Sequence, residues 1–298
     1  MAVKRSGARS RRPSRAAFVA VPLLLSACVS GAQAVAPAAS APVASPISPS
    51  ASAPRAPASS AVPAVQIDVG PGVSPEDEAD VRTGVTLAQA LVEGPLRSRG
   101  VPVRIRIFAG GTTGADPRLQ GNCCGAVSAD AISLDADHAA WRAGPLPARL
   151  WRQRIVIHEY VHIWQRALGC HDGPPLPEWF IEGFVEYAAY EAINRAAPET
   201  RSITLAAMRV ELRNAPPQLR SLRAFEPRAF AVATGYGRSY FAWERLVGNG
   251  LDRATAFCLA AARGSGRDWH DAFASIFGRT VDTFYDELEV YVSELLRG

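Results

Sequence analysis

Residues 150–168 read LWRQRIVIHEYVHIWQRAL, and this uninterrupted stretch decides how the centre of the chain folds. It contains neither Gly nor Pro, so we expect one long helix over about residues 148–169. Four residues advance a helix by about 6 Å and roughly one turn. His158 and His162 therefore lie on the same face, where both imidazoles can reach a single metal ion.

Glu159 follows the first of these histidines and completes the HExxH pattern. A carboxylate at this position is placed to accept a proton from a water held by the metal, without ligating the metal itself. Two histidines at this spacing can also be ordinary surface or core side chains. The chain has only five His residues, so a chance match is improbable, but the motif alone leaves both interpretations open.

A second helix is expected over about residues 178–193, after the loop at residues 170–177. Eight loop residues can span about 26 Å, which is enough to return the chain beside the first helix. Glu178, Glu182 and Glu186 then share one helix face, between apolar side chains. Spacing alone is equally consistent with an exposed stripe of acidic residues.

The two helices together resemble the core of the gluzincin metallopeptidases, the thermolysin-like clan also described as peptidase MA-like. Residues 179–187 read WFIEGFVEY, which is similar to the Trp-Leu-x-Glu-Gly-x-Ala-Glu-Tyr element of that clan. Phe180 and Val185 replace its Leu and Ala, apolar for apolar. The resemblance implies a Zn²⁺ ion whose third ligand, beside the two histidines, is Glu182. It also implies that Glu186 orients a ligating histidine.

Enzymes of this clan usually carry a further His or Tyr that donates a hydrogen bond to the oxyanion of the reaction. Residues 234–240 read TGYGRSY and resemble the entry to the carboxy-terminal helices of related proteins. The resemblance makes Tyr236 the candidate for this role and Tyr240 the reserve. Both tyrosines can equally be aromatic side chains that pack one helix on another.

Two other assignments of the third ligand compete with Glu182. The three-histidine zincins need Gly and His at fixed offsets, where this chain has Gln165 and Leu168. His171 and Asp172 lie in the loop between the two helices and reach the metal only if that loop folds back. The remaining two histidines are expected to be ordinary polar residues.

The rest of the chain predicts an α+β fold, in which a small mixed sheet precedes the helix pair and a helical carboxy-terminal part. Apolar residues alternate with period two at residues 65–69 and 101–107, and residues 131–134 form a third short strand. A helix lies between the first two strands, at residues 74–93. Further helices are expected at residues 236–248, 251–263, 268–277 and 281–296.

The amino-terminal part of the chain predicts export. Residues 1–27 combine a basic stretch with an apolar run that is too short to span a bilayer, and Leu-Ser-Ala precedes Cys28. This arrangement resembles a bacterial lipobox, so we expect a signal peptide, a lipidated Cys28 and a membrane anchor through that lipid. A coincidental Cys after an ordinary signal is the alternative. Residues 28–64 are mainly Ala, Pro, Ser and Val and form a tether, and residues 65–298 form the folded domain.

Charge excludes a nucleic-acid partner. The net charge is +4, but six of the 32 Lys and Arg side chains lie in the first fifteen residues. That leaves 26 basic against 28 acidic side chains, because residues 1–27 hold no Asp or Glu. The domain therefore lacks a basic surplus. We expect an exported lipoprotein of the bacterial cell envelope that faces the periplasm or the exterior.

Four cysteines remain in the domain, at positions 123, 124, 170 and 258. In an oxidising compartment they can form disulfides. A bond from Cys123 or Cys124 to Cys170 would fix the loop that leaves the active-site helix. Four cysteines allow three pairings, and the sequence does not choose between them.

The leading interpretation is a zinc metalloendopeptidase-like hydrolase that acts on a peptide or protein substrate. The alternative is a non-catalytic zinc-containing envelope lipoprotein that binds peptide or protein partners. The base at Glu159 favours the enzyme, because a purely structural metal site has no need of one. A helical envelope protein with an accidental motif is the third and simplest interpretation.

Overall fold

The structure of the 298-residue chain is a computed structural model. It describes residues 64–109, 124–128, 130–171, 176–215, 221–225, 235–248, 250–263 and 269–297. The signal peptide, Cys28 and all but the last residue of the tether lie outside these ranges, as do Cys123 and Asp172. No helix within the described ranges is both long enough and apolar enough to cross a membrane.

A four-stranded mixed sheet confirms the expected α+β class. Its strands are β1 (Val65–Val69), β2 (Val103–Phe108), β3 (Gly125–Val127) and β4 (Ala131–Asp135), in the order β1-β2-β4-β3. The pairs β1 with β2 and β2 with β4 are parallel, and β3 runs antiparallel to β4 at one edge. The sequence did not predict β3, because three residues are too few to show a period-two pattern.

The helix α1 (Pro75–Glu93) joins β1 to β2 and packs closely on α3 (Ala148–Ala167). The Ser74 side chain caps its first turn by accepting a hydrogen bond from the backbone N–H of Asp77. Gly84 lies in the middle of this helix, and a Cβ there would come within 2.7 Å of the Cβ of Val156. A glycine inside a helix, usually unfavourable, is therefore needed for the close approach of α1 and α3.

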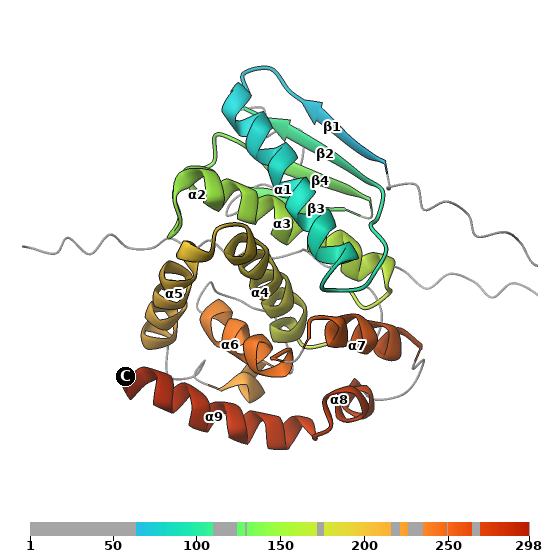
Figure 1. The fold of residues 1–298 in the computed structure, drawn as a ribbon, viewed down its shortest axis with the longest axis vertical. Helices are drawn as coiled ribbons and strands as arrows, with labels where there is room; N and C mark the ends of the chain where they lie inside the picture. The colour runs from blue at the N-terminus through green and yellow to red at the C-terminus, as the bar shows by residue number, and fades with distance from the viewer. Residues whose placement is uncertain are drawn as a thin grey trace, which may run out of the picture.

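Helix α3, which carries His158, Glu159 and His162, runs through the middle of the molecule (Figure 1). Every residue from Trp151 to Gln165 is buried, including the polar and charged ones. The chain reverses at Gly169, whose φ of 77° favours glycine, and returns as α4 (Glu178–Ala196). In Figure 1 the sheet, α1 and α3 form the upper half, and α4 begins the helical lower half. The two predicted active-site helices are thus packed side by side, as expected.

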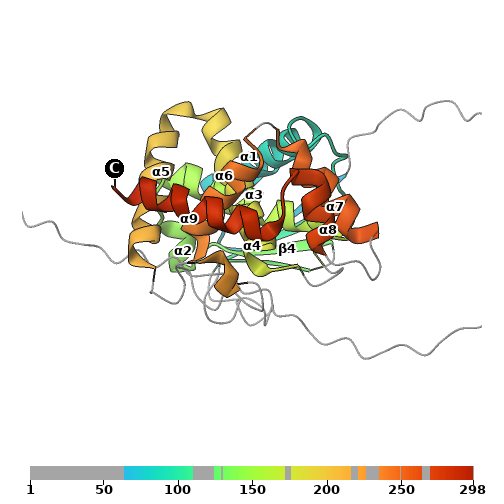
Figure 2. The same cartoon turned by 90° about the horizontal axis from the view of Figure 1, so that it is seen from below.

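The lower half consists of α4 and the helices that follow it. These are α5 (Arg201–Asn214), α6 (Tyr236–Leu246), α7 (Asp252–Arg263), α8 (Trp269–Phe277) and α9 (Val281–Arg297), with a short α2 (Ala139–Arg142) in the upper half and 3-10 turns at Pro198–Thr200 and Leu222–Phe225. Helix α9 runs across the lower face from α8 towards α5 (Figures 1 and 2). Side chains of α4, α6, α7 and α8 meet in an aromatic core that includes Phe180, Trp243, Phe257 and Phe277.

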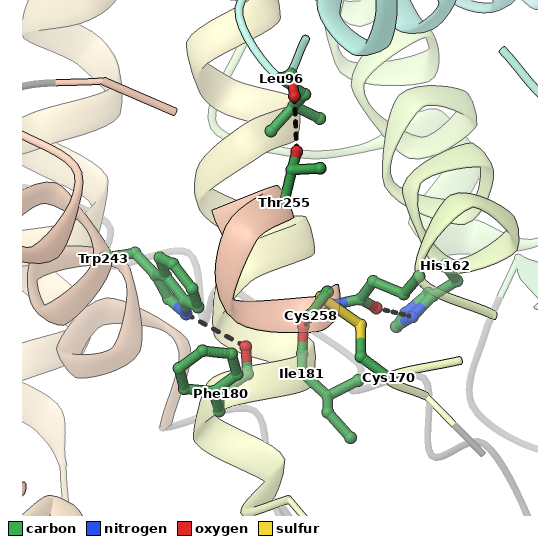
Figure 3. The surroundings of a disulfide bond; sticks show 9 residues. Leu96, His162, Cys170, Phe180, Ile181, Trp243, Thr255 and Cys258 are labelled. Carbon is green, nitrogen blue, oxygen red and sulfur yellow. Dashed lines mark hydrogen bonds between the residues drawn. A yellow bond between two sulfur atoms is a disulfide. The ribbon is translucent and has the colours of Figure 1, made fainter. Parts of the chain in front are cut away.

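A disulfide joins Cys170, just beyond α3, to Cys258 in α7 (Figure 3). The suggested bond from Cys123 or Cys124 to Cys170 is therefore wrong. A Cβ at Gly169, just beyond α3, would lie 3.3 Å from the Cβ of Ala262 in α7, and the Cα atoms of the two bonded cysteines are 5.0 Å apart. Cys124 is a buried free thiol.

Candidate metal centre

Three buried side chains from α3 and α4 converge on one point. His158 and His162 lie one turn apart on α3, with ring centroids 5.0 Å apart, and Glu182 faces them from α4. The Oε2 atom of Glu182 is 3.6 Å from Nε2 of His158 and 3.4 Å from Nε2 of His162. The exposed fractions of the three residues are 3%, 1% and 3%. The structure therefore brings together the three predicted ligands.

The donor set fits a metal ion. One ligand atom from each residue lies within 4.8 Å of the others. Tetrahedral zinc with bonds of about 2.0–2.2 Å separates neighbouring ligand atoms by about 3.3–3.6 Å, which agrees with the two Nε2–Oε2 distances. Moreover, Nε2 of His158 and Oε2 of Glu182 are buried without a hydrogen-bond partner in the described part of the chain. Buried polar atoms normally have a hydrogen-bond partner. A cation between these two atoms would give both of them a partner.

Charge at the three residues favours the same interpretation. Burial lowers the pKa of His158 to about 3, which keeps its ring neutral, the form that ligates a metal. Burial also opposes the charged forms of Glu182 and His162, but their mutual attraction outweighs it. The pKa of Glu182 is lowered and the pKa of His162 is raised. The carboxylate thus attracts positive charge to this point, and a metal ion can take the place of the proton.

Both histidines are held from behind through Nδ1. The Nδ1 atom of His158 lies 3.1 Å from Oε2 of Glu186, as the resemblance implied, and Glu186 is also paired with buried Arg154. The Nδ1 atom of His162 lies 3.2 Å from Oε1 of Gln165. The sequence alone did not indicate these roles of Arg154 and Gln165. The feature of the sequence that could have indicated these roles is helical spacing. Arg154 lies four residues before His158, and Gln165 lies three residues after His162, so each shares a helix face with its histidine.

Glu159 lies beside the candidate ligands and is covered by the edge strand β3. It is buried, and a Cβ at Gly125 of β3 would come within 2.7 Å of its Oε1. Burial raises the pKa of the Glu159 carboxyl to about 7. A carboxyl with this pKa can both take up and release a proton near neutral pH.

Of the two candidate tyrosines, only Tyr236 lies at the centre. It is the first residue of α6, it is buried, and its ring centroid is 6.5 Å from that of His158. Two glycines allow α6 to approach its neighbours closely. A Cβ at Gly183 of α4 would lie 2.4 Å from the Cβ of Ser239 in α6. A Cβ at Gly237 of α6 would lie 2.6 Å from the backbone oxygen of Met208 in α5. Tyr240 instead packs on Tyr187 and Tyr190, at 5.2 and 6.1 Å.

The other histidines and acids have different surroundings. The ring of His171 is 5.5 Å from that of His162 and receives a hydrogen bond of 3.4 Å from Arg166, and His171 is not part of the three-residue cluster. Asp172 lies outside the described residues. His138 caps α2, and the ring of His270 contacts that of Trp269 in a tilted arrangement, with the centroids 4.2 Å apart. The acidic face of α4 is not an exposed stripe, because Glu182 and Glu186 are buried.

Comparison of the chain with family models, with curated proteins and with solved structures gave no match. The chemistry inferred for the centre therefore rests on its own residues.

Proposed function

We propose that this chain is a zinc-dependent metallopeptidase. The observation that carries the proposal is the convergence of three buried ligand atoms, two of them without a hydrogen-bond partner, beside a buried carboxyl that titrates near neutral pH. His158, His162 and Glu182 would hold the ion. When bound, Zn²⁺ supplies Lewis acidity, which polarises a carbonyl and makes water more acidic.

Glu159 supplies the base in this proposal. Its carboxylate lies next to the ligands, and its raised pKa makes it a stronger proton acceptor than an exposed glutamate. It would take a proton from the attacking water and return it to the leaving nitrogen of the peptide bond. The buried position excludes solvent that would otherwise compete for the same proton.

Tyr236 supplies a donor. Burial, reinforced by the nearby Glu182, raises the pKa of its hydroxyl well above the ordinary value, so the phenol keeps its proton. A protonated hydroxyl at this place can donate a hydrogen bond to the carbonyl oxygen as that oxygen becomes negatively charged.

Three features favour catalysis over a purely structural metal. Structural zinc sites generally have four protein ligands, whereas the described residues supply three to this cluster. The candidate base Glu159 lies beside the candidate ligands, and the ring centroid of Tyr236 lies 6.5 Å from that of His158. We further propose, from the sequence of residues 1–64 alone, that the domain is exported to the bacterial envelope and tethered to a membrane through a lipid on Cys28.

The proposal is tested with the full-length protein stripped of metal and then reconstituted. The metal-free and zinc-loaded forms are incubated with a peptide library, and cleavage is followed by mass spectrometry. We expect one zinc per chain and cleavage only by the loaded form. A loaded protein that cleaves no peptide would favour the binding protein, and a protein that takes up no zinc would contradict both.

A further inference from the structure

We propose that Gln165 is a positioning residue that fixes the tautomer of His162 and ties this ligand to the backbone directly before Glu182. The inference concerns the same centre and rests on the proposed function only in requiring that a metal is bound there.

The side chain of Gln165 contacts both active-site helices. It lies three residues after His162 on α3, and its Oε1 is 3.2 Å from Nδ1 of that histidine. Its Nε2 donates a hydrogen bond of 3.2 Å to the backbone oxygen of Ile181, in the first turn of α4. Ile181 immediately precedes Glu182 in the chain. One amide therefore links the second histidine to the segment that carries the third ligand.

The backbone oxygen of Ile181 decides how the amide is oriented. A carbonyl oxygen only accepts hydrogen bonds, so Gln165 must present its NH₂ group to Ile181 and its oxygen to His162. That oxygen is also only an acceptor, so Nδ1 of His162 must carry the proton. The neutral ring then has its lone pair on Nε2, which is the atom that faces Oε2 of Glu182 at 3.4 Å. The contact thus selects the tautomer that can ligate a metal.

The backbone at both ends of this link is itself held in place. The N–H of Cys170 donates a hydrogen bond of 3.1 Å to the backbone oxygen of Gln165, and Cys170 is bonded to Cys258. On α4, the indole of Trp243 donates to the backbone oxygen of Phe180, next to Ile181, at 3.1 Å. Figure 3 shows His162, Ile181 and the disulfide close together. Each end of the link is therefore attached to a further helix, through Cys170 to α7 and through Phe180 to α6.

An amide side chain such as that of Gln165 can both accept a hydrogen bond from His162 and donate one to Ile181. A glutamate at this position still accepts from His162 but cannot donate to Ile181. A methionine has similar length and fills the same space but makes neither hydrogen bond. Comparing Gln165→Glu with Gln165→Met separates selection of the tautomer from simple filling of the site.

Gln153 offers a matched control on the same helix. Like Gln165 it is 1% exposed, and its Nε2 donates a hydrogen bond of 3.1 Å to Oδ1 of Asp80, away from the metal ligands. Gln153→Met removes a buried amide of the same kind without touching the centre. Any loss of metal affinity that merely follows loss of stability will appear in this variant as well.

The experiment uses the full chain in four forms: wild type, Gln165→Met, Gln165→Glu and Gln153→Met. Zinc affinity is measured by competition with a chelating dye, and the His162 tautomer by ¹⁵N chemical shifts of labelled histidine in the metal-free protein, at a pH where the ring is neutral. We expect Gln165→Met to weaken zinc binding about 10- to 100-fold and to lose the Nδ1–H tautomer. We expect Gln165→Glu to keep that tautomer, and Gln153→Met to keep both properties.

Wild-type affinity and an unchanged tautomer in Gln165→Met would overturn the inference, as would an equal loss of affinity in Gln153→Met. If Gln165→Met does not fold, loss of the Nδ1–H tautomer in Gln165→Glu overturns it. If the wild type binds no zinc, the proposed function fails, and the tautomers of the metal-free proteins still decide the role of Gln165. If zinc binds but no peptide is cleaved, only the proposed function fails.

Discussion

Gly125 of the edge strand β3 and Glu159 of the helix α3 lie so close that a methyl group does not fit between them. A Cβ at position 125 would be 2.7 Å from Oε1 of Glu159 and 3.0 Å from its Cδ. The strand thus covers the proposed base and determines where its carboxylate lies. Glycine is needed here for close approach, because it has no Cβ.

Gly125→Ala should therefore displace the carboxylate of Glu159 and lower peptide hydrolysis, by about 10²-fold if the displacement reaches 1 Å. Zinc affinity should stay near that of the wild type, since the atoms nearest to the added Cβ all belong to Glu159 and not to a candidate ligand. Gly84→Ala serves as the control for crowding of α3 in general, because its Cβ would be equally close to Val156 of that helix but would not meet Glu159. Wild-type turnover by Gly125→Ala would show that β3 does not position Glu159.

Glu182→Ala should abolish zinc binding or weaken it severely, because it removes the ligand that balances the positive charge of the ion. His171→Ala and Asp172→Ala should keep full zinc occupancy, as measured by mass spectrometry of the native protein. Unchanged affinity in Glu182→Ala would leave the HExxH pair possible as a metal site but would contradict Glu182 as its third ligand.

Arg154→Met should destabilise the fold and weaken zinc binding together. It leaves the carboxylate of Glu186, which is in contact with His158, buried without its cationic partner. Removing one partner of a buried ion pair typically lowers the free energy of unfolding by about 3–5 kcal/mol. Combining it with Glu186→Gln should recover much of this loss, because no unpaired charge remains. Chemical denaturation of the two single variants and the double variant measures the coupling, and additive effects would contradict it.

Glu211 should make stability depend on pH. It is buried on α5, and burial raises the pKa of its carboxyl to about 8, against the opposing effects of the Gly237 N–H and Arg154. The unfolded chain releases this proton near pH 4.5 and the folded chain near pH 8, so the folded state binds more protons between these values. The free energy of unfolding should therefore fall as pH rises from about 4.5 to 8, by a few kcal/mol at most.

Glu211→Gln tests this dependence, because the amide does not titrate. Urea unfolding at pH 5 and pH 8.5 should show a smaller decrease for the variant than for the wild type. Glu159 also has a raised pKa and contributes to the pH dependence of the free energy of unfolding in both proteins. The difference between the two proteins therefore reports on Glu211. Equal slopes in the two proteins would contradict the assignment.

The helices that carry the candidate ligands were predictable because both are long and because Gly169 and Pro177 bound the loop between them. Helix α3 contains no Gly or Pro, and in α4 only Gly183 interrupts the pattern. The strands β1, β2 and β4 showed their alternation clearly. Helix α5 was not predicted, since its buried residues include Thr204 and Glu211 while Ile203 and Val210 are exposed. The apolar residues of α5 therefore do not mark its buried face, which is determined by tertiary contacts with α6.

The candidate ligands were predictable because a helix fixes the spacing of His158 and His162 whatever surrounds it. The supports behind them were not, apart from Glu186, which the family resemblance implied. Gln165 meets Ile181 only when α4 folds back on α3, and Cys170 meets Cys258 across 88 residues of chain. Contacts of this kind depend on how elements distant in sequence pack, which local patterns do not encode.

The most direct test of the account compares the wild type with Glu159→Gln, both loaded with zinc and incubated with the same cleaved peptide. The amide has the size of the carboxylate and can still hydrogen-bond a water, but it cannot take up a proton. We predict equal zinc content and a rate of hydrolysis lower by about 10²- to 10⁴-fold in the variant. Full hydrolysis by zinc-loaded Glu159→Gln would contradict the role of Glu159 as the base and, with it, the proposed mechanism.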